Sequence, residues 1–115
     1  MDQVIQNELD TITGIIVNTL TVEQIYLFGS FAYGTATENS DFDLFVVIPD
    51  GSMRPLTAMQ EIGYAIFGLT RRPVDVLVGT RSSFDTRKQQ PTLERTIDKK
   101  GVLLYGGPQR TKVMA

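Results

Sequence analysis

Residues 29–48, with the sequence GSFAYGTATENSDFDLFVVI, decide the fold of this chain. Gly29 and Ser30 close the apolar run of residues 25–28, so the pattern predicts a strand that gives way to a turn or to the start of a helix. Backbone amides and a hydroxyl presented at such a point suit a polyphosphate. The first part of the stretch therefore predicts a phosphate-binding turn.

Two aspartates stand at the entrance of the next apolar run. Asp41 and Asp43 are two residues apart, and because side chains alternate along a strand, both carboxylates are expected on one face. Gly-Ser alone is usually a turn, and Asp-x-Asp alone is usually a solvated loop or a helix cap. Paired aspartates that run straight into an apolar strand are costly without a counter-charge, and Mg²⁺ accepts both carboxylates and substrate phosphates as ligands. The combination favours a metal site next to the phosphate-binding turn.

A third strand is predicted over residues 73–78, where valines alternate and Asp75 falls on the face opposite to them. Asp75 is either a solvated residue of an edge strand or, if this strand neighbours Asp43, a third member of the acidic group. Three crowded carboxylates raise one another's pKa until a cation binds. Arg71 and Arg72, just upstream, are either solvated or steer a triphosphate.

The strand predicted over residues 41–48 has no polar face beyond its two aspartates, so we expect it to be buried on both sides and central in the sheet. Tyr64 and Phe67 are apolar residues in addition to the core stripe of their helix, so they are candidates for docking a partner. That stripe is expected to consist of Leu56, Met59, Ile62, Ile66 and Leu69. The other predicted elements are a helix over residues 4–20, a turn over 49–52, a helix over 55–69, a weakly helical segment over 81–90, a helix from 91 that Gly101 ends, and a strand over 102–105.

Composition limits the classes of function. The chain has 115 residues, 42% of them hydrophobic, which predicts one domain over residues 1–107, a flexible tail over 108–115 and no appended substrate domain. The absence of cysteine and histidine excludes zinc sites built on those ligands, thiol catalysis and imidazole-based triads. A formal charge of −2 without a long basic run argues against a stable nucleic-acid partner. No segment has the pattern of a secretion signal or a membrane span, so we expect a cytoplasmic protein.

The chain resembles the minimal nucleotidyltransferases of the DNA polymerase beta superfamily, in which Gly-Ser is followed ten residues later by Asp-x-Asp. The resemblance runs from about residue 21 to residue 105 and includes YLFGS, SDFDLFVV, the later strand with its lone acid, and GVLLYG. Within that family the chain is similar to the small antitoxin subunits that are paired with HEPN-domain ribonuclease toxins. One departure is Tyr33, which stands where many relatives carry arginine in the motif GSFARG.

The resemblance implies an α/β fold of the α+β type, like the polymerase beta palm, with a small mixed sheet, helices mainly on one face and the metal site at one edge. It implies two Mg²⁺ ions as cofactors, ATP as the substrate and AMP as the transferred group. The implied acceptor is a tyrosine hydroxyl of a HEPN toxin, held in a hetero-oligomer, whose ribonuclease activity the modification silences. The implied site residues are Asp41, Asp43 and Asp75 for catalysis and metal binding, and Gly29, Ser30 and Ser40 for the nucleoside triphosphate.

Two other functions stay open. The first is a binding module that neutralises its toxin by docking alone and keeps the nucleotide site only as a relic; the complete set of acids argues against it and Tyr33 leaves it open. The second is a small-molecule nucleotidyltransferase resembling the aminoglycoside-modifying enzymes. Those enzymes normally hold their acceptor with an additional helical domain, for which 115 residues leave no room.

Overall fold

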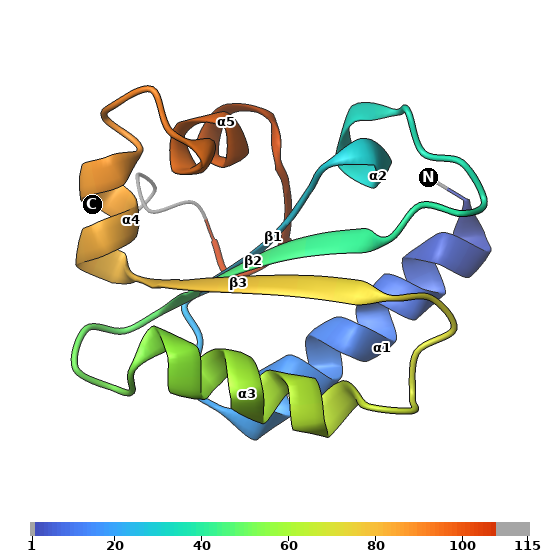
Figure 1. Cartoon of the computed structure of the whole chain (residues 1–115), viewed down its shortest axis with the longest axis horizontal. Helices are drawn as coiled ribbons and strands as arrows, with labels where there is room; N and C mark the ends of the chain where they lie inside the picture. Colours follow the sequence, from blue (N-terminus) through green and yellow to red (C-terminus); the bar gives the residue numbers. More distant parts are fainter. Residues whose placement is uncertain (1, 108–115) are drawn as a thin grey trace.

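The computed structural model describes residues 2–107 as a four-stranded mixed sheet with helices on both faces (Figure 1). The strand order is β3-β2-β1-β4, in which β1 runs antiparallel to β2 and β4, and β2 runs parallel to β3. The predicted tail, residues 108–115, lies outside the described residues. The elements are α1 (Gln3–Thr19), β1 (Gln24–Phe28), α2 (Ser30–Tyr33), β2 (Phe42–Ile48), α3 (Pro55–Ile66), β3 (Val74–Thr80), α4 (Arg81–Arg87), α5 (Leu93–Lys100) and β4 (Val102–Tyr105).

One face of the sheet is covered by α1 and α3, which lie below it in Figure 1. Asp2 caps α1, since its carboxylate accepts a hydrogen bond from the N–H of Val4 at 2.6 Å. The apolar sides of both helices pack on alternate residues of the strands, and this makes the larger core. Its buried members are Leu9, Ile12, Ile16, Ile25, Leu27, Phe42, Leu44, Val46, Ile48, Ala58, Ile62 and Ile66.

The opposite face is covered over part of its length by α4 and α5, which lie above the sheet in Figure 1 together with α2. Tyr26 and Phe45 point to this side and contact the ring of Phe84, with ring centres 5.7 and 5.4 Å apart. Val47 and Ile97 complete this second core. The expectation of helices mainly on one face therefore holds for the two long helices, whereas α4 and α5 cover part of the other face.

β2 occupies an interior position and contributes buried side chains to both cores, which confirms its predicted central place. The sequence pattern predicts a strand over residues 41–48, but the strand begins at Phe42. Asp41 therefore lies just before the strand and not inside it. β3 is an edge strand. Its three valines, at positions 74, 76 and 78, pack into the larger core, and Asp75 is exposed on the opposite side.

The helix predicted over residues 55–69 ends earlier, at Ile66. Gly68 has a φ of +75°, which carries the chain into a turn, and the N–H of Leu69 donates to the carbonyl of Ile66 at 3.0 Å. Phe67 therefore belongs to the turn, where its side chain is exposed.

The buried stripe of α3 also differs from the predicted one. Ala58, Ile62 and Ile66 face the sheet, whereas Leu56 and Leu69 are 61% and 64% exposed. Leu56 and Ala58 are separated by about 200° around a helix of 3.6 residues per turn, so they cannot share a face. Burial of the smaller Ala58 lets α3 lie close to the sheet and leaves the outer side of α3 apolar.

Gly101 ends α5 as predicted, although not with the left-handed conformation usual at such a position. Its φ and ψ are −67° and 159°, an extended geometry. A Cβ at this position would lie 2.6 Å from the carbonyl oxygen of Ile97 and 3.2 Å from that of Leu27. Glycine is therefore required here by contact with the last turn of α5 itself and, less closely, with β1, and not by the backbone conformation.

None of the helices within residues 2–107 has both the length and the apolar character needed to cross a bilayer.

Candidate functional site

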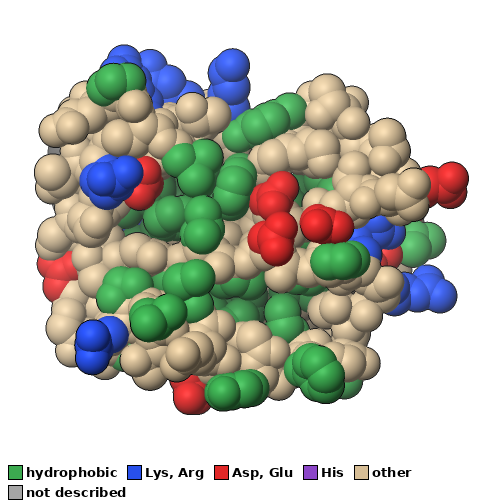
Figure 2. All heavy atoms as spheres, in the orientation of Figure 1, with side chains coloured by type: hydrophobic (Ala, Val, Ile, Leu, Met, Phe, Trp, Pro, Cys, Tyr) green, Lys and Arg blue, Asp and Glu red, His purple; other side chains and the backbone are tan. Residues whose placement is uncertain are grey.

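Asp41, Asp43 and Asp75 lie near one another at one end of the face that carries α4 and α5. Asp43 is paired with Asp75 in the parallel register of β2 and β3, and Asp41 lies two residues before Asp43. The register confirms the predicted placement of Asp75 beside Asp43. Asp43 is half-buried and Asp75 is exposed on the edge strand. Figure 2 shows acidic side chains gathered at the front of this face, next to exposed hydrophobic ones, so the acidic group is open to solvent on one side.

The carboxylate of Asp43 is affected by its burial and by the other two acids. Burial raises the pKa of Asp43 above its ordinary value, and the charges of Asp75 and Asp41 raise it further. These effects disfavour the ionised form of Asp43, and a bound cation would reverse them.

The donor set fits Mg²⁺ without forming a complete cage for it. No group of three or more acidic side chains among residues 2–107 is close enough to hold a metal ion by itself. Mg²⁺ usually takes one or two carboxylates and completes its octahedron with water and substrate phosphate oxygens. Paired carboxylates beside the predicted phosphate-binding turn are therefore a suitable partial ligand set.

Gly29 joins the predicted phosphate-binding turn to the acids. Its φ of +74° and ψ of −158° lie in a region that essentially only glycine adopts. A Cβ on Gly29 would strike Oδ2 of Asp43 and lie 3.1 Å from its Cγ. The preceding residue, Phe28, pairs with Asp43 in the antiparallel register of β1 and β2. Glycine at position 29 thus lets the backbone of the turn lie directly against the carboxylate.

The short helix α2 follows Gly29 directly. The Gly29 carbonyl accepts hydrogen bonds from the N–H groups of Ala32 and Tyr33, at 3.0 and 3.1 Å. The N–H groups of Ser30 and Phe31 come too early in the helix to have an acceptor within it. Together with the half-buried Ser30 hydroxyl, they are the donors that this turn can offer to a phosphate.

Ser40 shapes the loop that leads to the aspartates. Its hydroxyl accepts a hydrogen bond from the N–H of Thr37 at 2.9 Å, and its carbonyl accepts one from Arg72 at 3.4 Å. These bonds determine how the chain approaches Asp41. Contact of Ser40 with a nucleotide stays a prediction.

Arg72 has a place near the site that the sequence pattern did not reveal. It is neither solvated nor directed at the acidic face: its guanidinium carbon lies 5.1 Å from the ring centre of Phe31 and 5.0 Å from that of Phe42. It also pairs with Glu8 of α1 at 3.4 Å. A signal was present in the sequence, since aromatic residues directly follow the Gly-Ser pair and separate the two aspartates.

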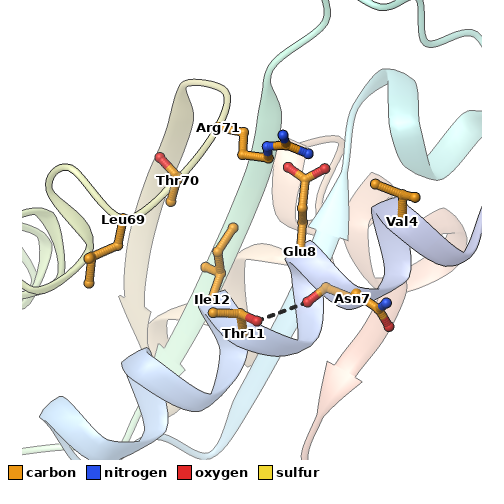
Figure 3. A pocket seen from close by; sticks show the side chains of 8 residues that line it. All are labelled: Val4, Asn7, Glu8, Thr11, Ile12, Leu69, Thr70 and Arg71. Carbon is orange, nitrogen blue, oxygen red and sulfur yellow. Dashed lines mark hydrogen bonds between the residues drawn. The ribbon is translucent and has the colours of Figure 1, made fainter.

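A hollow of about 310 Å³ lies elsewhere, between α1 and the loop that leads to β3 (Figure 3). Glu8 is its single acidic residue and is already paired with Arg72. α1 covers the sheet face opposite to the aspartates, so this hollow is separated from their carboxylates. It therefore lacks the ligands for a metal-bound nucleotide. Its lining residues are Val4, Asn7, Glu8, Thr11, Ile12, Leu69, Thr70 and Arg71.

Comparison with known proteins assigns a family to this arrangement. The family model described as "Nucleotidyltransferase domain" matches residues 9–104. No curated protein sequence matches the chain significantly.

Three solved structures share the fold at identities below 25%. A chain of a toxin–antitoxin complex with AMP-PNP is 22% identical, with a TM-score of 0.63 over 95% of this chain and 81% of that one. A chain of the MntA–HepT toxin–antitoxin complex is 19% identical, with a TM-score of 0.54 over 96% and 80%. A chain from the complex between the tri-AMPylated Shewanella oneidensis HEPN toxin and MNT antitoxin is 20% identical, with a TM-score of 0.53 over 96% of this chain and 79% of that one.

Proposed function

Because the chain belongs to the nucleotidyltransferase domain family, we propose that it is a Mg²⁺-dependent enzyme that transfers AMP from ATP to a hydroxyl of a partner protein. One observation carries the proposal: the Gly29 turn lies against Asp43, and Asp43 is paired with Asp75 at the open edge of the sheet. The proposed phosphate-binding turn and the proposed metal-binding carboxylates thereby lie side by side, as transfer of a nucleotide requires.

Each site residue has a proposed part in the reaction. Asp41, Asp43 and Asp75 would hold two Mg²⁺ ions, and Gly29, Ser30 and Ser40 would bind the triphosphate. When bound, Mg²⁺ supplies charge neutralisation for the triphosphate and for the departing pyrophosphate. The backbone amides and the Ser30 hydroxyl then orient the terminal phosphates, so that the α-phosphorus faces the acceptor.

Asp75 is proposed to prepare the acceptor. Its carboxylate would orient the acceptor hydroxyl and receive its proton. The hydroxyl oxygen forms a bond to the α-phosphorus, and the bond from that phosphorus to pyrophosphate breaks. Exposure of Asp75 on the edge strand β3 supports this part, because a macromolecule can approach it from outside the sheet.

We propose a tyrosine of a HEPN-domain toxin as the acceptor, which makes this chain the antitoxin of a hetero-oligomeric pair. The support is similarity to an MNT antitoxin complex whose HEPN toxin is tri-AMPylated, and to a toxin–antitoxin complex with AMP-PNP. Tyr64 and Phe67, 79% and 87% exposed, offer aromatic anchors for such a partner. α3 packs against β3, so a partner seated there reaches Asp75 across the edge of the sheet.

Neutralisation by docking alone is the second candidate function. The same exposed aromatic residues support it, and Tyr33 stands where many relatives carry arginine. Docking requires only the outer surface of α3 and the turn after it, whereas transfer also requires the acids.

The test combines the purified chain with ATP, Mg²⁺ and its proposed HEPN partner, for which the product of the adjacent gene is the first candidate, and measures the mass of both proteins. We expect the HEPN protein to gain AMP units with the wild type and none with the Asp41→Asn, Asp43→Asn double variant. Coexpression gives the second readout, since a catalytic antitoxin with these substitutions no longer protects the cell. Growth rescue by the double variant, with no mass gain by the toxin under wild-type conditions, would overturn catalysis and leave docking as the function.

A further inference from the structure

The neighbours of the candidate site residues come together in the larger core, beneath the site. Phe31 follows Ser30 in α2, and Phe42 stands between the two aspartates. Both side chains pack into the core beneath the sheet, where their ring centres are 4.8 Å apart with an angle of 56° between the planes. The guanidinium of Arg72 lies against both rings, within the distance at which cation–π attraction acts. Phe31, Phe42 and Arg72 are called the Arg72 cluster below.

Polar contacts connect the Arg72 cluster to two further segments. Nη1 of Arg72 donates to the carbonyl of Ser40 at 3.4 Å, and Nε donates to the carboxylate of Glu8 at 3.4 Å. Both bonds are long, yet only 19% of the Arg72 side chain and 14% of the Glu8 side chain are exposed, so the charges attract more strongly than they would at the surface. The next residue, Pro73, accepts a hydrogen bond from the N–H of Phe42 at 3.1 Å.

These contacts join the parts of the site that the chain itself leaves apart. The phosphate-binding turn leads into α2, whereas Asp41 follows a loop without regular structure. The packing of Phe31 against Phe42 relates the two, in addition to the close approach of Gly29 to Asp43. Arginine suits this position because its planar guanidinium stacks on aromatic faces while its edge donates hydrogen bonds in fixed directions. A lysine would keep the charge and lose the planar group.

We propose that Arg72 is a positioning residue for nucleotide transfer, which holds the phosphate-binding turn and the aspartates in register through Phe31, Phe42 and the Ser40 carbonyl. It touches neither nucleotide nor acceptor in this role. The inference rests on the proposed function for its consequence in transfer, but the positioning itself is measurable without any transfer.

The experiment compares Arg72→Ala and Arg72→Lys with Arg71→Ala, a control that removes the same charge from the exposed adjacent residue. Hydrogen exchange of backbone amides is followed along the chain, and the affinity for Mg²⁺ with AMP-PNP is measured by calorimetry. For Arg72→Ala we expect exchange over residues 29–43 to rise and affinity to fall by about tenfold each, from loss of a partly buried cation–π pair. Arg72→Lys should keep only part of the wild-type protection from exchange and part of the wild-type affinity. In Arg71→Ala both quantities should stay within about twofold of the wild type.

Glu8→Gln keeps the test decisive if Arg72→Ala does not fold. It removes one charge from the pair and leaves the stacking intact, so exchange in the same segment should rise by about threefold. Unchanged exchange over residues 29–43 in the arginine variants, a uniform rise along the whole chain, or equal effects of Arg71→Ala and Arg72→Ala would overturn the proposal. Local loosening in Arg72→Ala, together with no AMP transfer by the wild type, would overturn the proposed function and support the positioning role.

Discussion

The face of the sheet that carries α4 and α5 has two ends built from the same strands and used in opposite ways. At the closed end, Phe45 of β2 packs with Phe84 of α4, and Val47 and Ile97 complete the apolar cluster. Two residues earlier in β2, the side chain on this face is Asp43, which is paired with Asp75 of β3. α4 and α5 lie over the first end, and only the short α2 stands near the second (Figure 1).

The difference between the two ends shows which one serves stability. Apolar side chains at the closed end leave water and thereby stabilise the fold. At the acidic end, burial and two like charges raise the pKa of Asp43, so its ionised form is disfavoured. A strand pair that is apolar at one end and accepts crowded charges at the other is typical of a functional site.

The largest effect is expected from Asp43→Asn, which changes the acidic end alone. The rate of AMP transfer should fall by about 1000-fold or more, because an amide replaces a carboxylate that is proposed to bind the metal. At pH 7 the variant should remain folded and melt slightly higher, since one of three like charges is gone. Mass spectrometry of the partner gives the rate, and circular dichroism gives the melting temperature. A wild-type rate would contradict the assignment, and a loss of ~1–3 kcal/mol in stability would indicate a structural role instead.

Phe84→Ala is the converse change at the closed end. Deleting this buried ring, which contacts Tyr26 and Phe45, should cost about 3–5 kcal/mol of unfolding free energy, measured by urea denaturation. The folded fraction should bind Mg²⁺ with AMP-PNP as the wild type does, because the ring lies away from the acids. Lost affinity in fully folded protein would mean that the two ends are not independent.

Gly29→Ala tests the contact between the turn and the acidic end. Its Cβ strikes the Asp43 carboxylate and its φ is strained, so AMP-PNP affinity should fall by roughly tenfold to a hundredfold. Gly68→Ala is the matched control: its φ is +75°, against +74° at Gly29, but no atom lies within 4 Å of the added Cβ. It should lose stability and keep its affinity. Similar affinity losses in both variants would show that backbone strain, not the contact with Asp43, determines binding.

Ser30→Ala should have a smaller effect at the same turn. It removes one hydroxyl among several donors, so affinity for Mg²⁺ with AMP-PNP should fall by about threefold to tenfold in calorimetry. Ser52→Ala, in the turn between β2 and α3, deletes an exposed hydroxyl away from the site and should leave affinity unchanged. Equal affinity in wild type and Ser30→Ala would place the phosphates away from this hydroxyl.

The smallest effect is the pH dependence of the stability gained by Asp43→Asn. The folded state raises the pKa of Asp43, so it holds this proton more tightly than the unfolded chain does. The destabilisation from ionised Asp43 is therefore absent below the ordinary value of 3.8, grows as pH rises through the folded pKa, and is complete above it. Melting without Mg²⁺ from about pH 3.5 to 8 should show the variant's advantage only toward the upper end. An advantage that is constant over this range would show that it does not come from ionisation of Asp43.

The sequence by itself predicts the order of the elements and the centre of the site. Alternation in β3 places the valines and Asp75 on opposite faces, and the unbroken apolar run of β2 predicts a strand buried on both sides. Gly29, Asp41 and Asp43 are close in the chain, so their neighbourhood follows from local geometry. Such features depend on periodicity and turn chemistry, which any segment expresses without reference to the rest of the molecule.

Only the tertiary structure decides the features that join distant segments. The sequence around Arg72 predicts a solvated or phosphate-steering cation. In the structure Arg72 packs on Phe31 and Phe42 because α2, β2 and the segment before β3 converge there. Leu56 reads as core, yet Ala58 is buried, since the orientation of α3 is set by how closely it packs on the sheet. Gly101 reads as a helix end, although the Leu27 carbonyl of another strand is part of what demands glycine. In each case at least one of the partners lies far away in the chain, and its distance and direction exist only once the layers have packed.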